Sequence, residues 1–138
     1  MRDEARIWLD YSRENLESAQ ILLKSSLFNP CLQNCQQCVE KALKSLLLEN
    51  SIPIKKTHGI FELRNMLFQN RIAVDINEEE CEFLDSIYLP SKYPLHSVLP
   101  YYMPDQNLCE QGISIAQKIY DEIQKILQEH DLRKKQES

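Results

Sequence analysis

The 138-residue sequence predicts an all-α protein with a single domain, and three observations support this fold class. Apolar residues recur at spacings of three and four over several long stretches, which is the period of an amphipathic helix. Only two glycines are present, which argues against β structure rich in hairpins and excludes a glycine-rich phosphate loop. A chain of this length buries roughly two thirds of its unfolded surface, so one hydrophobic core is sufficient.

The first two predicted helices follow one another with almost no linker. Residues 3 to about 26 carry apolar side chains at helical spacing, with charged side chains on the other side. The second helix spans residues 29–50. Asn29 is suited to cap its first turn, and Pro30 stands where a missing N–H costs nothing. Because so few residues separate the two helices, we expect them to form an antiparallel hairpin.

The second predicted helix has two distinct faces. Its wide apolar stripe is expected to be buried, and it consists of Leu32, Cys35, Val39, Ala42, Leu43, Leu46 and Leu47. A polar line follows one side of the helix and consists of Gln33, Gln37, Lys41 and Lys44. The two lysines on this line are therefore candidates for contact with a ligand.

Capping signals predict two further helices in the middle of the chain. Thr57 is suited to cap a helix that begins at His58 and ends near Gln69. His58 then lies in the first turn, where it either packs or serves a site. Asn77 and Glu80 have the spacing of a capping box and mark the start of the fourth helix.

The last helix is predicted to begin after its cap, Asp105, and to end near His130. Residues 131–138 form a polar tail that is expected to fray. The sequence therefore predicts one helical domain over residues 1–130, followed by this short tail.

The segment from Tyr88 to Pro104 interrupts the helical pattern. Its four prolines exclude a continuous helix or a central strand. Its four tyrosines argue against a solvated linker, because disordered linkers are poor in aromatic residues. We therefore expect an ordered loop before the last helix, and long ordered loops are often functional.

Charge and hydropathy limit the classes of function. The net charge of -5 argues against a protein that coats nucleic acid nonspecifically, although a local basic patch remains compatible with it. The N-terminal residues are charged from position 2 and lack the apolar region of a signal peptide. No apolar run approaches the ~20 residues that a membrane span needs. We therefore expect a cytoplasmic protein without membrane contact.

Five cysteines are present, and three of them fall on the second predicted helix. Cys35 and Cys38 form a C-x-x-C pair, which in another setting indicates zinc or redox chemistry. Here the pair lies in the middle of a helix, without a second pair to complete four metal ligands. Buried cysteine also packs well as a small hydrophobic residue. We therefore expect free thiols, no metal and no cofactor.

Taken in order, these features resemble the HEPN family (higher eukaryotes and prokaryotes nucleotide-binding domain). The matching residues are Ala5, Trp8 and Leu9, the pattern from Gln36 to Leu47, Thr57 with His58, Tyr88, and Lys92-Tyr93-Pro94. The resemblance implies an up-and-down four-helix bundle with an additional short helix, usually a homodimer. It also implies partnership with a minimal nucleotidyltransferase, as in toxin–antitoxin pairs.

The chain departs from the nuclease members of the family at one motif. Those members carry an arginine, four to six other residues and then a histidine, whereas here His96 follows Lys92 by four positions. An RNase needs an acid or base and a cation for the charge that develops on phosphorus. Lysine lacks the planar fork of arginine, so the exchange is not conservative. Whether the protein is an enzyme therefore stays open at this point.

The resulting hypothesis is a HEPN-type module that binds a nucleotide or a nucleic-acid phosphate. The ligand-binding residues would be Lys41, Lys44, His58, Lys92 and Tyr93, with lysines for phosphate charge and tyrosine for stacking. One alternative is a ribonuclease that uses His96 and Lys92 as its catalytic pair. The other alternative is a helical adaptor whose tyrosine-rich loop packs at a subunit interface.

Overall fold

The computed structural model describes residues 1–54, 56, 59–92 and 103–137; for residues 88–92 it describes the backbone only. Over these ranges it consists of helices and connections, without strands, as the sequence predicts. The helices are α1 (Asp3–Lys24), α2 (Phe28–Glu49), α3 (Ile60–Gln69), α4 (Glu78–Lys92) and α5 (Gln106–Glu137). None of these helices is both long and apolar enough to cross a membrane.

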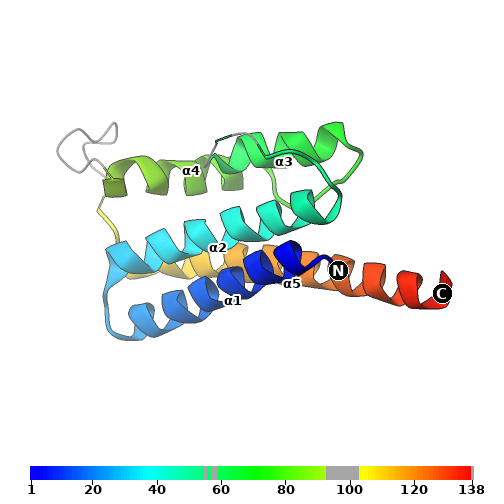
Figure 1. Ribbon diagram of the computed structural model, residues 1–138. Helices are drawn as coiled ribbons and strands as arrows, with labels where there is room; N and C mark the ends of the chain where they lie inside the picture. Colours follow the sequence, from blue (N-terminus) through cyan, green and yellow to red (C-terminus); the bar gives the residue numbers. More distant parts are fainter. Residues whose placement is uncertain (55, 57–58, 93–102, 138) are drawn as a thin grey trace.

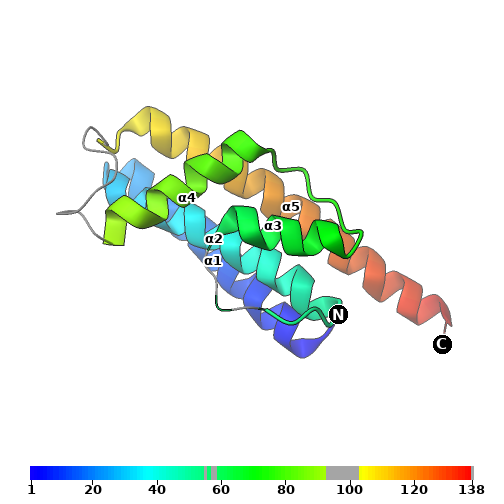
Figure 2. The same cartoon turned by 90° about the horizontal axis from the view of Figure 1, so that it is seen from above.

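The four long helices form an up-and-down bundle, and the short α3 lies beside α4 in the layer that covers α2 (Figure 1). α2 contacts each of the other four helices and occupies the centre of the bundle. α1 and α2 run antiparallel, which confirms the predicted hairpin (Figure 1). The end of α4 and the start of α5 lie at the same end of the bundle as the turn between α1 and α2 (Figures 1 and 2).

The core forms around the apolar stripe of α2. All seven residues predicted for that stripe are fully buried. α5 contributes a second row of buried residues, which consists of Cys109, Ile115, Ala116, Ile119, Tyr120, Ile123 and Leu127. Burial of one leucine or isoleucine side chain contributes about 1.5–3 kcal/mol, so these rows dominate the stability of the fold.

α2 and α5 pack tightly against each other at Gly112. A Cβ atom at this position would lie 3.1 Å from Cys35 Sγ and 3.3 Å from Leu32 Cδ2. Both distances are shorter than ordinary van der Waals contact, so a side chain at residue 112 would require Cys35 or Leu32 to shift by a few tenths of an ångström.

Two predicted caps are confirmed. Asn77 Oδ1 accepts a hydrogen bond from the Glu80 N–H (2.8 Å), and Glu80 Oε1 accepts one from the Asn77 N–H (3.0 Å), which completes the capping box. Asp105 Oδ1 accepts a hydrogen bond from the Leu108 N–H (2.8 Å) at the start of α5. Glu80 also binds the Lys118 ammonium at 2.8 Å, so the first turn of α4 is tied to α5.

The start of α2 differs from the prediction. The N-cap is Leu27, without a side-chain hydrogen bond, and Asn29 is already inside the first turn. The cause lies in α1, which ends in a Schellman turn. Ser26 adopts a positive φ of 57°, and the Leu27 N–H donates to the Leu22 carbonyl at 2.9 Å. Leu27 therefore belongs to the C-terminal turn of α1 and is also the N-cap of α2, so no residue remains for a separate cap.

The start of α3 also differs. The N-cap is Gly59, and α3 begins at Ile60 rather than at residue 58. A carboxylate from another helix takes the place of a local cap: Asp85 on α4 accepts hydrogen bonds from the N–H groups of Ile60 (2.7 Å) and Phe61 (3.3 Å). The predicted cap Thr57 and the candidate His58 lie outside the described residues.

Two helices are longer than the sequence indicates. α4 continues through Lys92, so the predicted loop does not begin at residue 88. Pro90 falls in its last turns, where a missing N–H removes one helical hydrogen bond without ending the helix at once. α5 continues through Glu137, seven residues past its predicted end. Residues 93–102 lie outside the described part of the chain.

The close approach at Gly112 yields a double-mutant prediction. We expect Gly112→Ala to lower the free energy of unfolding by about 1 kcal/mol, because overpacking a core outweighs the helix propensity of alanine. Cys35→Ala removes the nearest atom, so the loss should be smaller in that background, with a coupling of at least about 0.5 kcal/mol. Urea unfolding of the four proteins measures the coupling. Ser114→Ala, at an exposed position of α5, is the control, and strictly additive effects would contradict the prediction.

Candidate functional site

The two lysines on the polar line of α2 contact α1, and Lys41 does so through two side chains. Its ammonium donates a hydrogen bond to Asn15 Oδ1 at 2.9 Å and lies 5.8 Å from the centroid of the Tyr11 ring. Asn15 in turn donates to Asn34 Oδ1 at 2.9 Å. These contacts connect α1 and α2 along one side of their interface and give Lys41 a structural explanation.

Lys44 lies one turn further along α2 and is only 8% exposed. Its ammonium is 5.6 Å from the centroid of the Trp8 ring and 3.8 Å from Glu40 Oε1. A buried ammonium is stable only where a carboxylate or an aromatic face replaces water, and here both are present. The Trp8 ring and the Glu40 carboxylate therefore compensate for the loss of water around the Lys44 ammonium. Because Trp8 is on α1, this contact stabilises the hairpin.

Of the other predicted site residues, only Lys92 lies within the described part of the chain. Lys92 is the last residue of α4, at the end of the bundle where α2 begins (Figure 1). Lys41 lies thirteen residues beyond the start of α2, which is about 20 Å along the helix axis. His58, Tyr93 and His96 lie outside the described residues. The structure thus brings Lys41 and Lys44 together, and the convergence of all five ligand-binding candidates stays a prediction.

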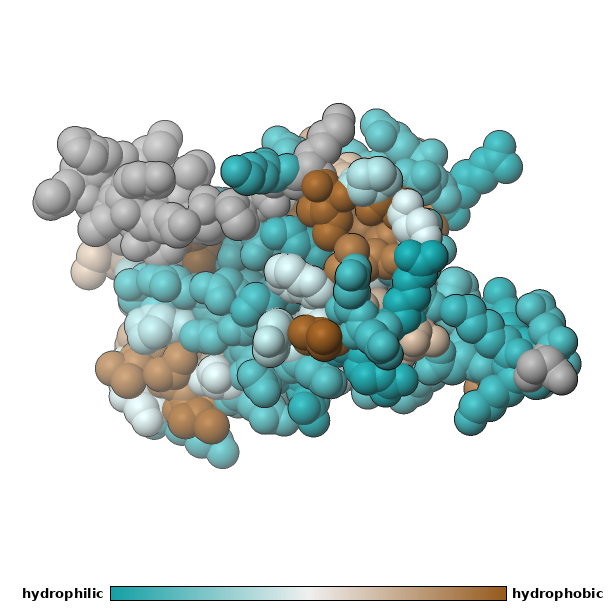
Figure 3. Space-filling model, viewed as in Figure 1, coloured by the Kyte–Doolittle hydropathy of each residue, from teal (hydrophilic) through white to brown (hydrophobic). Residues whose placement is uncertain are grey.

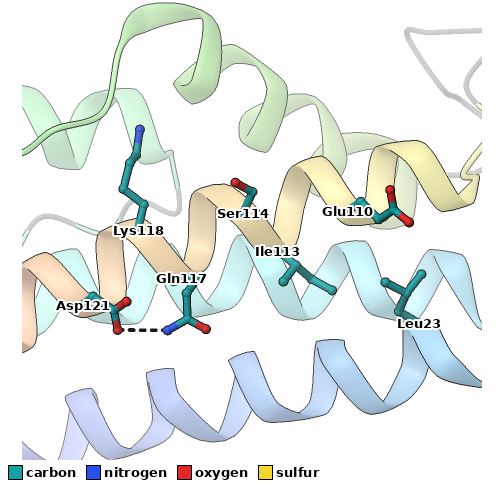
Figure 4. Close-up of a pocket in the computed structure, with 7 residues that line it drawn as sticks. All are labelled: Leu23, Glu110, Ile113, Ser114, Gln117, Lys118 and Asp121. Atoms are coloured by element: carbon teal, nitrogen blue, oxygen red, sulfur yellow. Dashed lines mark hydrogen bonds between the residues drawn. The ribbon is translucent and has the colours of Figure 1, made fainter.

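A shallow groove lies between α1 and the first half of α5, and nothing in the sequence pattern indicated it. It encloses about 480 Å³ and is lined by Leu23, Glu110, Ile113, Ser114, Gln117, Lys118 and Asp121 (Figure 4). Gln117 donates to Asp121 Oδ1 at 2.9 Å along its floor, while Lys118 turns toward α4, where Glu80 binds it. The groove offers two carboxylates and two apolar side chains, and its lining carries no imidazole or thiol.

A buried carboxylate near the C-terminal end of α2 joins this helix to the N-terminal segment and to α5. The Glu49 side chain is fully buried and accepts a hydrogen bond from the Arg2 N–H at 2.8 Å. His130 Nδ1 lies 3.2 Å and Lys134 Nζ 3.9 Å from its Oε2 atom. Burial by itself raises the pKa of Glu49, but these groups and the Met1 ammonium outweigh it and hold the pKa below its usual range. Glu49 therefore fastens the last turns of α5 to the bundle.

The cysteines are free, and all five are buried. Burial raises the pKa of Cys38 and Cys109 to about 12 and that of Cys81 to about 11, and it also raises the pKa values of Cys31 and Cys35. Cys38 Sγ lies 3.3 Å from Ser12 Oγ, between α1 and α2. Within the described ranges, no group of His, Cys, Asp and Glu side chains is arranged to hold a metal ion.

Comparison with known families identifies the chain. The model of the HEPN domain matches residues 5–127, which is most of the sequence. The chain belongs to the HEPN domain family. Two curated relatives of this HEPN protein come from Methanocaldococcus jannaschii. "Putative toxin MJ1304" is 30% identical over 100 residues, which cover 71% of this chain and 62% of that relative, so the match spans less than two thirds of its length. "Putative toxin MJ0605" is 24% identical over 131 residues, which cover 94% of this chain and 92% of the relative.

Two solved structures share the fold. TT1696 from Thermus thermophilus superimposes with a TM-score of 0.71 at 28% identity, over 90% of this chain and 98% of that one. ST0689, described as an archaeal HEPN homologue, gives a TM-score of 0.68 at 24% identity, over 89% and 97% of the two chains. The helical fold of this HEPN domain is therefore also found in these two solved structures.

The buried thiols lead to a prediction about reactivity. Because the thiolate is the reactive form, we expect the native protein to react very slowly with a thiol reagent at pH 8. In denaturant without reductant, five thiols per chain should react, and elemental analysis should find no stoichiometric zinc. Fast reaction of the native protein, fewer than five thiols after unfolding, or one zinc per chain would each refute the prediction.

Glu49 leads to a prediction about pH. Its folded pKa is lowered, so its contribution to stability is complete above its unfolded pKa and is lost as the pH falls through the folded value. We expect Glu49→Gln to cost about 1–3 kcal/mol at pH 7 and much less at pH 3. Urea unfolding at the two pH values measures the difference. Glu129→Gln, at an exposed position on α5, is the matched control. An equal cost of Glu49→Gln at both pH values would show that its charge is not involved.

Proposed function

We propose that this HEPN protein is the helical component of a toxin–antitoxin-like pair and that it binds a nucleotide or a nucleic-acid phosphate. The observation that carries the proposal is the match to two curated relatives whose names describe toxins, one of them along 94% of this chain. Membership of the HEPN family supports the ligand class. The partner in this proposal is a minimal nucleotidyltransferase. The protein itself acts as a homodimer in this proposal, and we expect light scattering of the purified chain to give a mass of about twice 16.3 kDa.

The residues proposed to bind phosphate exclude the two lysines of α2 that have partners within the protein. Lys41 and Lys44 are engaged with α1, which shifts the proposal toward the segment that joins α4 to α5. This segment begins after Lys92 and contains Tyr93 and His96. A lysine supplies charge to a phosphate, and a tyrosine supplies a ring or a hydroxyl to the base.

A ribonuclease is the second candidate function, because Lys92 and His96 in the same segment could imitate the nuclease motif, although lysine replaces its arginine. His96 would act as general acid or base, and Lys92 would stabilise the charge on the phosphorane. The two functions place Lys92 in the same role and differ only in what they require of His96. His96 is therefore the residue that separates a binding module from an enzyme.

The experiment measures binding of fluorescent ATP and cleavage of transfer RNA by the purified full chain. We expect Lys92→Ala to weaken ATP binding by about 1–3 kcal/mol, the range for a lost charge-assisted hydrogen bond. Lys125→Ala, which removes an exposed lysine of α5, should leave binding unchanged.

His96→Ala should keep its affinity for ATP if the protein is a binding module. Loss of RNA cleavage in this variant would instead assign the ribonuclease function. The proposal fails if the wild-type chain neither binds ATP nor cleaves RNA, or if Lys92→Ala and Lys125→Ala behave alike.

A further inference from the structure

The outer face of α3 carries two exposed aromatic rings. Phe61 is 39% exposed and Phe68 is 71% exposed, whereas Leu63 and Leu67 on the inner face are fully buried. A separation of seven residues places the two rings on the same side of the helix, about 10 Å apart along its axis. α3 lies on the outside of the bundle when the molecule is seen from above (Figure 2). Hydrophobic side chains also reach the surface in the region of α3 (Figure 3).

Positive charge accompanies these rings. Arg64 falls on one flank of the line from Phe61 to Phe68 at 100° per residue. Arg71 follows the C-cap of α3, and its N–H donates to the Phe68 carbonyl at 3.0 Å. Among the described residues, no carboxylate forms an ion pair with Arg64 or Arg71. Arg64 and Arg71, on α3 and next to its C-cap, therefore outnumber the one carboxylate of this helix, Glu62, on a chain whose net charge is -5.

Amide groups border the rings on the other side. Asn65 and Gln69 are one turn apart and lie on the flank opposite Arg64. Together with Glu62 and Met66 they line a shallow depression of about 240 Å³. An amide offers both a donor and an acceptor, which is the combination that the edges of nucleobases require.

We propose that the outer face of α3 is a binding surface for single-stranded nucleic acid. Bases stack on Phe61 and Phe68, the phosphate backbone follows Arg64 and Arg71, and base edges reach the amide flank. Stacking on aromatic rings requires unstacked bases, so the face fits a single strand better than a duplex. This surface does not involve the segment between α4 and α5, so the inference goes beyond the proposed function and is independent of Lys92.

The alternative occupant, a second copy of the chain, fits this face poorly. A two-fold axis through the middle of α3 would place each Phe61 opposite the Phe68 of the other copy. The same axis would bring Arg64 against its own copy, with no described carboxylate paired to it. Charge complementarity therefore favours a polyanion over self-association at this face.

The experiment uses fluorescein-labelled U12 RNA, the full chain and fluorescence anisotropy at 50 mM salt. We expect Phe68→Ala to weaken binding roughly tenfold, in the range known for base stacking on an aromatic side chain. Arg64→Gln and Arg71→Gln should each lower the slope of log K against log salt by roughly 0.7, the value for one contact to single-stranded phosphate. The matched controls are Leu132→Ala and Lys125→Gln, which remove an exposed apolar and an exposed basic side chain from α5.

Four outcomes would overturn the inference. They are no binding of U12 by the wild-type chain, equal weakening by Phe68→Ala and Leu132→Ala, loss with the arginine variants alone, and a Phe68→Ala change in mass by light scattering without a change in binding. The last outcome would assign the face to a second copy. Because Phe68 and Arg71 are exposed, their variants should fold, and circular dichroism checks this. Loss of ATP binding in Lys92→Ala with unchanged U12 binding would separate the two surfaces.

Discussion

α2 is buried along nearly its whole length, and the other four helices are positioned by their contacts with it. Fourteen of its 22 residues are buried, including four polar or charged residues besides Gln36. Each buried polar side chain on such a helix needs a partner within the protein. The tight packing at Gly112 shows how little space remains there between α2 and α5.

The buried polar groups of α2 meet this requirement through local bonds and through other helices. Ser45 Oγ donates to the Ala42 carbonyl at 2.6 Å within the helix. On α1, Ser12 Oγ donates to the Cys38 carbonyl at 2.7 Å and so gives this backbone acceptor a second hydrogen bond. Glu49 receives its bonds from the N-terminal segment and from α5. The same contacts that satisfy these groups also fix the position of each neighbouring helix against α2.

The sequence predicted the helices well because the apolar period is a local signal. It predicted the capping box of Asn77 and Glu80 and the cap Asp105 for the same reason, since donor and acceptor lie three residues apart. The start of α3 could not be found in this way, because its cap is Asp85, 25 residues further along the chain. The turns after α1, α2 and α3 could not be predicted from the sequence either. Each uses a residue with positive φ that is not glycine, namely Ser26, Ser51 and Arg71.

Prediction of the candidate functional site from the sequence has the same limit, because it also depends on contacts between residues far apart in the chain. Helical spacing placed Lys41 and Lys44 on one line, but spacing does not say whether that line meets solvent or a neighbouring helix. Trp8 and Tyr11 on α1 decide the matter, and their identity as partners depends on the packing of the hairpin. By contrast, the separation of seven residues between Phe61 and Phe68, out of phase with Leu63 and Leu67, was readable from the sequence alone. Two apolar residues on the solvent-facing side of an amphipathic helix are a signal that is missed when only the core-facing residues are considered. On α3 of this HEPN domain it marks the face that the bundle does not cover.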